Sequence, residues 1–370
     1  MKRILMAAAL FCCMTTMALL TSCTEVEPIE YGKVFDYTYQ GQTLYYIVDS
    51  AGEASVVPPL YPYLDYKTDE SWTGYDKPQG DVVIPDHVPY CGKDYPVKRI
   101  LFCAFFKCYD ITNVSLPSTL TFIDKHSFLL CTSLTSIEVP EGVTDICFGA
   151  FDTCESVTSI SLPSTLKYIG EWCFLSCLKV SELVLPNSLE YLGDNCFTDM
   201  EALVSINLPE SLKSMGVGIF DNCFNLTEVT IPTAIKEVPG WAFSNCLSLT
   251  KVNLHDGITS IGEGAFNNMP YIKSITLPAS LKTIGKDAFH YDASLGPNID
   301  IPAEVTSIAD DAFAECYGIQ TITLACTTPP AILVNTFPGF DITVIVPKGS
   351  GDAYRNHDIW GRFATIQEKE

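Results

Sequence analysis

The sequence has little positive charge and no motif for metal or catalytic chemistry. It carries 22 Lys and Arg against 44 Asp and Glu, a formal net charge of −22. Phosphate backbones and anionic lipid headgroups need clustered Lys and Arg, which argues against nucleic acid and bare lipid surfaces as partners. His-Glu-x-x-His, Cys-x-x-Cys, Gly-x-Ser-x-Gly and phosphate-loop patterns are missing. We therefore predict no enzyme, no catalytic residue, no metal and no cofactor.

A long apolar run stands at the N-terminus. Lys2 and Arg3 precede the run Ile4–Leu20, and small residues follow it up to Cys23. This is the pattern of a secretory signal, whereas a transmembrane anchor would be near the short limit for spanning. Leu20-Thr21-Ser22-Cys23 resembles a bacterial lipobox, in which the cysteine is lipidated. We predict a lipoprotein signal peptide at residues 1–22 and lipid attachment at Cys23; plain cleavage that leaves a free cysteine is the alternative.

The mature chain would be more acidic still. Without residues 1–22 it keeps 20 basic and 44 acidic side chains, a balance of −24. Such charge favours a soluble monomer. The acidic residues after Cys23 begin a polar tether at residues 23–30, and the lack of Asp next to Cys23 resembles lipoproteins sorted to the outer membrane. The predicted location is the outer membrane or cell surface, with membrane contact through the lipid only.

A repeat with a step of 23 organises the rest of the chain. The phenylalanine of the rung Leu134–Cys154 recurs in ten other rungs, with two steps of 24 at the end. These eleven residues are Phe105, Phe128, Phe151, Phe174, Phe197, Phe220, Phe243, Phe266, Phe289, Phe313 and Phe337. A fixed period of this length predicts stacked units that share one continuous core.

Each rung predicts one strand and one tight turn. Leu134, Ile137 and Val139 alternate with polar residues, the pattern of a strand with one buried face, and Pro140 ends it. A glycine often follows the next inward residue and is expected to permit a tight turn. The Ala-Phe-x-x-Cys segment is expected to form one helical or 3-10 turn. Met replaces the repeated Cys in two rungs, which indicates buried thiols rather than disulfides.

The motif Leu-x-x-Ile-x-Val, with Pro after the strand and then Ala-Phe and Cys, resembles the BspA-like leucine-rich repeat family of bacterial surface proteins. The match covers about residues 82–347. It implies an α/β leucine-rich repeat solenoid: a strand-rich right-handed superhelix with short helical or 3-10 turns, capped at both ends. One departure is that the asparagine usual in many leucine-rich repeats is replaced by Thr, Ser, Gly or Ala. Another lies between Phe289 and Phe313, where Asp292 replaces the cysteine and Leu295–Asn298 predicts a local bulge.

The ends depart from the repeat. Residues 31–100 are tyrosine-rich and predict an N-terminal cap with a strand at Thr43–Val48 and a first degenerate rung at Val82–Pro85. Residues 101–324 hold the repeats. Residues 325–370 predict a last strand at Ile342–Pro347 and a C-terminal cap with Tyr354 and Trp360.

The outward strand residues form the candidate binding face. Solenoids bind through their concave sheets, and the concave sheet predicted here is rich in hydroxyls, poor in charge and free of aromatics. Strands that are merely exposed to solvent would have the same composition, since Thr and Ser suit such positions. The candidates are Thr135, Ser136, Glu138, Ser159, Ser161, Glu182, Ser205, Asn207, Thr230, Lys251 and Asn253.

Three functions remain open at this stage. The resemblance implies a non-enzymatic surface protein that binds a host or neighbouring-cell protein. The alternative is a glycan-binding accessory lipoprotein of a polysaccharide-uptake system, but exposed aromatics are expected only in the end regions. A third hypothesis is an enzyme site between the tyrosine-rich cap and the first rung. Asp256 and Asp310-Asp311 are read as solvated acids and not as a calcium site.

Overall fold

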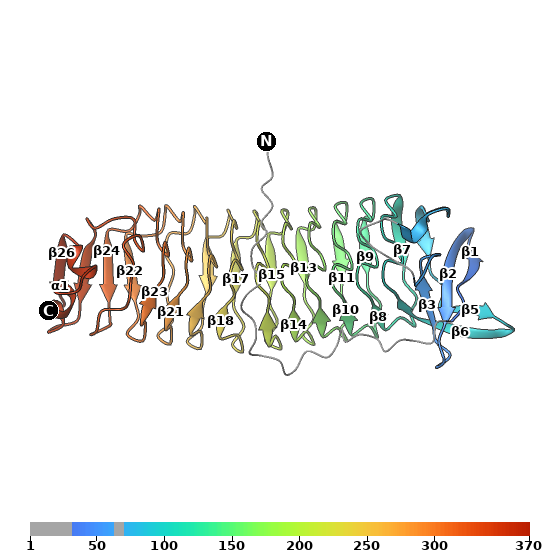
Figure 1. Cartoon of the computed structure of the whole chain (residues 1–370), viewed down its shortest axis with the longest axis horizontal. Coiled ribbons are helices and arrows are strands. Elements are labelled where there is room, and N and C mark those ends of the chain that lie inside the picture. The colour runs from blue at the N-terminus through green and yellow to red at the C-terminus, as the bar shows by residue number, and fades with distance from the viewer. Residues whose placement is uncertain (1–31, 63–69) are drawn as a thin grey trace.

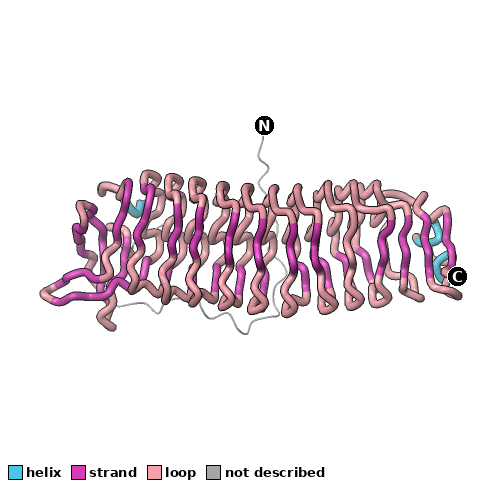
Figure 2. The backbone as a smooth tube through the Cα atoms, turned by 180° about the vertical axis from the view of Figure 1, so that it is seen from behind, coloured by secondary structure: helices cyan, strands magenta, loops and turns pink. Residues whose placement is uncertain are grey.

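The computed structural model describes residues 32–62 and 70–370. The predicted signal peptide, Cys23, the tether, Tyr63 and Tyr66 lie outside these residues. The described chain is an elongated solenoid whose rungs stack along one axis, with the C-terminus at one end (Figure 1). Seen from behind, the rungs again stand side by side across the long axis (Figure 2). This confirms the strand-rich solenoid.

One series of strands carries the Leu-x-x-Ile-x-Val segments. Inward residues such as Ile137 are buried and their neighbours point out, because side chains alternate along a strand. The pairs within the series are parallel, as expected for successive turns of a solenoid. The strands are β4 (Gly80–Val83), β7 (Ile111–Ser115), β9 (Ser136–Glu138), β11 (Ser159–Ser161), β13 (Glu182–Val184), β15 (Ser205–Asn207), β17 (Glu228–Thr230), β19 (Lys251–Asn253), β22 (Asn298–Ile301), β24 (Thr321–Leu324), β25 (Thr343–Val346) and β26 (Thr365–Glu368).

A second series of short parallel strands carries the next inward residue of each rung. Ile146 and its equivalents are buried there, so both series cover the same core. The strands are β6 (Lys93–Ile100), β8 (Phe122–Ile123), β10 (Asp145–Ile146), β12 (Tyr168–Ile169), β14 (Tyr191–Leu192), β16 (Ser214–Met215), β18 (Glu237–Val238), β20 (Ser260–Ile261), β21 (Thr283–Ile284) and β23 (Ser307–Ile308).

The repeated phenylalanines form one continuous stack through the core. All eleven rings are buried, and neighbouring rings lie nearly parallel with centroids 4.9 to 6.0 Å apart. The stack runs unbroken from Phe105 to Phe337 and includes both of the longer steps at its end. Stacked aromatic pairs contribute about 0.5–1.5 kcal/mol beyond their buried area. Each rung is therefore held mainly by its two neighbours.

The predicted helical turn around each phenylalanine is wrong. Residues two before and two after the ring adopt positive φ, as at Gly149 (56°) and Thr153 (58°). Phe151 and Thr153 donate their N–H groups to the following rung, at 2.9 and 2.8 Å, while Asp152 donates within its own turn. A helix would keep these donors inside one turn. These N–H groups therefore link neighbouring rungs and do not form a helix. The described chain contains almost no helix, so the predicted α/β class is corrected to a strand-rich solenoid.

The repeated glycine after the second strand also acts differently from the prediction. Gly170, Gly193, Gly216, Gly262 and Gly285 do not have positive φ; a Cβ there would lie 2.3 to 2.7 Å from the backbone of the preceding rung. Glycine is therefore needed for close approach of stacked chains and not for turn freedom.

Two side-chain ladders replace the usual asparagine ladder. At the position where asparagine is absent, the hydroxyls of Thr165, Ser188 and Ser211 donate to carbonyls of the preceding rung at 2.6 to 2.8 Å. A second ladder lies two residues after the phenylalanine: Asn268 donates to Asn245, Asn245 to Asn222 and Asn222 to Asp199, at 2.8 to 2.9 Å. This ladder was not predicted, although asparagine is the residue expected at a left-handed position.

The cysteines are free thiols, as expected from their exchange with Met. Of the thirteen described cysteines, twelve are buried and Cys91 is exposed. The repeated thiols donate to the phenylalanine carbonyl of the preceding rung, with Sγ–O distances of 2.9 to 3.7 Å in six rungs. Burial raises the pKa of these thiols, which keeps them protonated and unreactive.

The N-terminal end adds antiparallel strands to the solenoid. These are β1 (Phe35–Tyr39), β2 (Gln42–Val48) and β3 (Ala54–Val57), with the 3-10 turn η1 (Glu70–Trp72) and β5 (His87–Tyr90), which forms a projecting hairpin with β6 (Figure 1). The predicted strand at Thr43–Val48 is confirmed as β2. In the predicted degenerate rung, β4 pairs in parallel with β7.

The C-terminal end closes with aromatic side chains. Helix α1 (Gly351–Arg355) and the 3-10 turn η2 (Trp360–Arg362) bury Tyr354 and Trp360. The Trp360 ring lies 5.8 Å from Phe337, the last ring of the stack. The strand predicted at Ile342–Pro347 is β25, but it is not the last strand, because β26 pairs beyond it.

The irregular section, residues 270–301, breaks the first strand series. Residues 271–277 contain no strand, although their rung keeps β21 in the second series. The rings of Phe289 and Phe313 stack at a step of 24 in the sequence, yet Asn298 pairs with Thr321 at a step of 23. One extra residue therefore lies between Phe289 and Asn298, which confirms the predicted bulge. Gly296 has φ +146°, and a Cβ there would lie 2.2 Å from Gly318 O.

Candidate functional site

The predicted binding face lies on the outer side of the first-series strands β9 to β19, which we call the strand face. Nine of its eleven candidate residues are exposed, while Ser136 and Asn253 are half-buried. Thr135 directly precedes β9, and the others lie on β9, β11, β13, β15, β17 and β19. The structure thus gathers all eleven on one surface; that this surface binds a partner stays a prediction.

The threonines at the start of these strands are tied into the solenoid. Thr135 Oγ1 donates to Thr112 O at 3.0 Å, Thr158 Oγ1 to Thr135 O at 3.3 Å and Thr250 Oγ1 to Thr227 O at 3.3 Å. These hydroxyls support the stacking of rungs. Within the described ranges, by contrast, the hydroxyls of Ser159, Ser161 and Ser205 make no hydrogen bond, so they are available to a partner.

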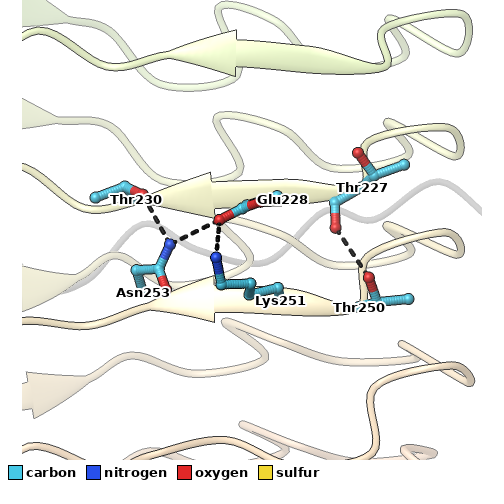
Figure 3. A network of polar contacts seen from close by, with 6 residues as sticks. All are labelled: Thr227, Glu228, Thr230, Thr250, Lys251 and Asn253. Atoms are coloured by element: carbon cyan, nitrogen blue, oxygen red, sulfur yellow. Dashed lines mark hydrogen bonds and ion pairs between the residues drawn. The ribbon is translucent and has the colours of Figure 1, made fainter.

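The polar residues of β17 and β19 form a network (Figure 3). Lys251 Nζ pairs with the Glu228 carboxylate, and Asn253 Nδ2 donates to Glu228 Oε1 and Thr230 Oγ1, both at 2.9 Å. The Lys251 hydrogen bond lowers the pKa of the exposed Glu228. Glu228 was not among the candidate site residues, although its strand position puts it on this face. The pairing cancels the charge of Lys251, so this part of the face is polar but nearly neutral.

An apolar spot interrupts the hydroxyls. Val184 on β13 is 78% exposed, and Val204, just before β15, is also exposed. Val184 pairs in register with Asn207. Two exposed apolar side chains thus lie beside free hydroxyls on the strand face.

Exposed aromatics are not confined to the ends, contrary to the expectation. Outside the first and last rungs, Trp172, Tyr271, Tyr291 and Tyr317 are all exposed. Trp172 lies 5.4 Å from Phe148, which in turn contacts His126. The position of these aromatics in the turns, away from the alternating strands, explains why the strand pattern did not reveal them.

Neither a cluster of metal ligands nor a helix able to span a membrane is found in the described part of the chain. Residues 32–62 and 70–370 contain no group of three or more His, Cys, Asp and Glu side chains that could hold a metal. His255, which replaces the repeated proline, uses both ring nitrogens within the protein, through Ile235 O and Gly257 N. No helix in those same ranges is long and apolar enough to cross a bilayer.

The repeat of this chain matches that of a known protein family. The sequence matches the family described as BspA type Leucine rich repeat region, in 6 copies over residues 98–226 and 213–337. The chain belongs to this family. No curated protein matches it.

Solved structures share the fold of this BspA-type repeat protein. A leucine-rich repeat protein from Bacteroides ovatus ATCC 8483 has a TM-score of 0.67 and 23% sequence identity, covering 86% of this chain and 81% of that one. The pneumococcal vaccine antigen PcpA has a TM-score of 0.50 and 16% identity, covering 91% of this chain and 99% of that one. Membership in the family supports a general role in protein interaction.

Proposed function

We propose that this BspA-type protein is a lipid-anchored surface protein that binds another protein through its strand face. The observation that carries the proposal is the strand face itself. It runs across six successive rungs, presents free serine hydroxyls around Val184 and pairs Lys251 with Glu228. Such a surface can hold a partner by many hydrogen bonds, each worth about 0.5–1.5 kcal/mol. Host or neighbouring-cell adhesion is the role that the family suggests.

The anchor is part of the proposal. Lipid on Cys23 would hold the solenoid at the outer membrane or cell surface by its N-terminal end, since several acyl chains bind membranes far more firmly than one. We expect Cys23→Ala to release the protein from the membrane fraction. Absence of labelled palmitate from the wild-type chain would show that the anchor is wrong, while leaving the strand face to be tested separately.

The strand face is tested with residues 24–370. The protein is screened against immobilised extracellular-matrix proteins, and any that bind are measured again with a block variant. The block replaces Ser159, Ser161, Ser205 and Thr230 by Gln, which is larger but neutral. Loss of four modest contacts, about 2 kcal/mol or more together, predicts at least about 30-fold weaker binding.

A matched control block lies on, or directly before, strands of the second series. Exposed residues Lys167, Glu237, Lys282 and Thr283 are replaced by Gln. We expect this variant to bind normally, and both variants to keep the melting temperature within a few degrees of wild type. Equal loss of binding in both blocks, or none in the first, would contradict the proposed surface.

A further inference from the structure

Three exposed tyrosines gather on successive rungs in and next to the irregular section. Tyr271, Tyr291 and Tyr317 are 63%, 54% and 68% exposed. The core of these rungs is already filled by Phe266, Phe289 and Phe313. The tyrosines are therefore not needed to fill this core.

Tyr271 and Tyr317 stand on either side of small residues. The Gly296 N–H donates to Lys273 O at 3.0 Å, which aligns Tyr271 with Ser294 on the next rung. Gly318, next to Tyr317, packs so closely that a Cβ would lie 2.6 Å from Leu295 O and 3.1 Å from Ala293 O. Two rungs at about 4.8 Å each separate the tyrosines by roughly 10 Å. Between them, Ala293 and Ser294 are exposed and leave open space above the backbone.

Tyr291 lies beside these residues and has the positive φ that its position also has in neighbouring rungs. Its φ is 66°, at the position where the previous rungs place Asn222, Asn245 and Asn268. Asparagine tolerates this region, whereas a bulky residue there is rare. The His290 ring stacks on Tyr291 at 4.0 Å and its Nδ1 lies 3.2 Å from Asp287 Oδ1. The strained position thus ends the asparagine ladder and presents a fixed aromatic ring to solvent.

A carboxylate lies beside one of the rings. The Tyr317 hydroxyl donates to the Glu315 carboxylate, which is the main cause of the raised pKa of Tyr317. The Tyr291 side chain contributes to the same rise, which places it within electrostatic reach of Tyr317. Exposed tyrosine rings and the carboxylates of Asp287 and Glu315 thus lie on neighbouring rungs.

We propose that Tyr271, Tyr291 and Tyr317 form a binding site for a neutral glycan. A sugar ring offers C–H groups, which pack on an aromatic face, and hydroxyls, which donate to carboxylates such as Glu315 and Asp287. The amphipathic tyrosine ring suits a ligand of this kind. The acidic chain disfavours anionic polysaccharides. The site is separate from the strand face, so it adds a second ligand to the proposed function and does not depend on it.

The test measures binding of residues 24–370 to neutral polysaccharides: amylose, a mixed-linkage β-glucan and a mannan, with polygalacturonate as the anionic comparison. Affinity electrophoresis and calorimetry compare wild type with the triple variant Tyr271→Ala, Tyr291→Ala and Tyr317→Ala. We expect at least one neutral glycan to bind and the triple variant to lose at least 100-fold in affinity. Tyr317→Phe, which keeps the ring, is expected to stay within threefold of wild type.

Tyr109→Ala is the matched control, because Tyr109 is also exposed and follows its phenylalanine by the same four residues as Tyr317. It should bind glycan normally, as should the strand-face block. The glycan site is refuted if no neutral glycan binds wild type or if the triple variant retains its affinity for glycan. It is also refuted if the triple variant loses binding to a protein partner but not to glycan. A failure of the strand-face experiment leaves this result unaffected.

Discussion

The rungs before residue 270 keep the repeat regular, whereas the irregular section, residues 270–301, departs from it. In the regular section, residues 101–269, the columns of Phe and inward aliphatic residues recur in each rung and side-chain hydroxyls bond from rung to rung. Its first strand series is interrupted between β7 and β9 and between β11 and β13, but each rung still forms a strand. In the irregular section one strand is missing, one residue is inserted and Asp292 enters the cysteine column.

The comparison indicates which features the fold needs and which it can vary. The phenylalanine stack and the second strand series pass through the irregular section without a break. Only the first series and the adjoining turns change, and two of the three exposed tyrosines of the proposed glycan site lie there. Local departures from a repeating pattern are where functional sites are expected.

The largest effect is expected from breaking the shared stack. Phe174→Ala removes a buried ring that contacts Phe151 and Phe197, and should lower the free energy of unfolding by about 3–5 kcal/mol. Phe289→Ala should cost the same, because the stack is continuous in both sections. Urea unfolding measures both free energies. If either variant lost less than about 1 kcal/mol, the ring in that section would not contribute to a continuous stack as described.

A second effect tests a feature found only before residue 270. Asn222→Ala removes two ladder hydrogen bonds, to Asp199 and from Asn245, and places alanine at φ 60°. The expected loss is about 2–3 kcal/mol. Asn222→Gly adopts this φ without strain. It should therefore regain the part of the lost stability that is due to backbone strain, but not the part that is due to the hydrogen bonds. Equal stability of the alanine and glycine variants would argue that strain plays no part.

A third, opposite effect is expected at Asp292. Its Oδ1 accepts the Met269 N–H at 2.6 Å, and Oδ2 has no hydrogen-bond partner. Asp292→Met, the residue used in this column at Met200 and Met269, should stabilise the protein by about 1–2 kcal/mol at pH 7. Asp292→Asn keeps an acceptor without charge and serves as control.

The pH dependence of this gain follows from the carboxyl. Burial raises the pKa of Asp292 well above its usual range. The folded chain then binds the proton more tightly than the unfolded chain, so wild-type stability falls as pH rises from about 4 through the folded pKa. The advantage of Asp292→Met should therefore grow between pH 5 and pH 8. If the stability gain of Asp292→Met stayed constant or shrank as the pH rose, the raised pKa of Asp292 in the folded chain would be contradicted.

The smallest effect concerns accessibility and not stability. In native residues 24–370, a thiol reagent should modify one cysteine, Cys91, and after denaturation all thirteen, because the other twelve are buried. Bridges within the cysteine column would lower the denatured count and contradict the packing of free thiols.

The period and the burial of its columns could be predicted from sequence because they depend on residue type at fixed spacing. Ile137, Ile146 and Phe151 lie where their pattern places them. The turn conformation could not, since the positive φ at Thr153 follows from a hydrogen bond to the next rung. The role of Gly193 likewise depends on the backbone of the preceding rung, which the local sequence does not reveal. The exposed tyrosines lie in turns, where no alternation marks the outward side.

The most direct test of this contrast is native-state hydrogen exchange resolved along the chain. In the regular section the backbone of β17, Glu228–Thr230, pairs with β19, whereas residues 271–277 form no strand. We expect the amides of residues 273–277 to exchange at least about 100-fold faster than those of residues 228–230. Thr283 and Ile284, in the same rung, should stay protected because β21 pairs on both sides. Equal protection of residues 273–277 and 228–230, or loss of protection that reaches Ile284, would contradict a local interruption on a continuous core.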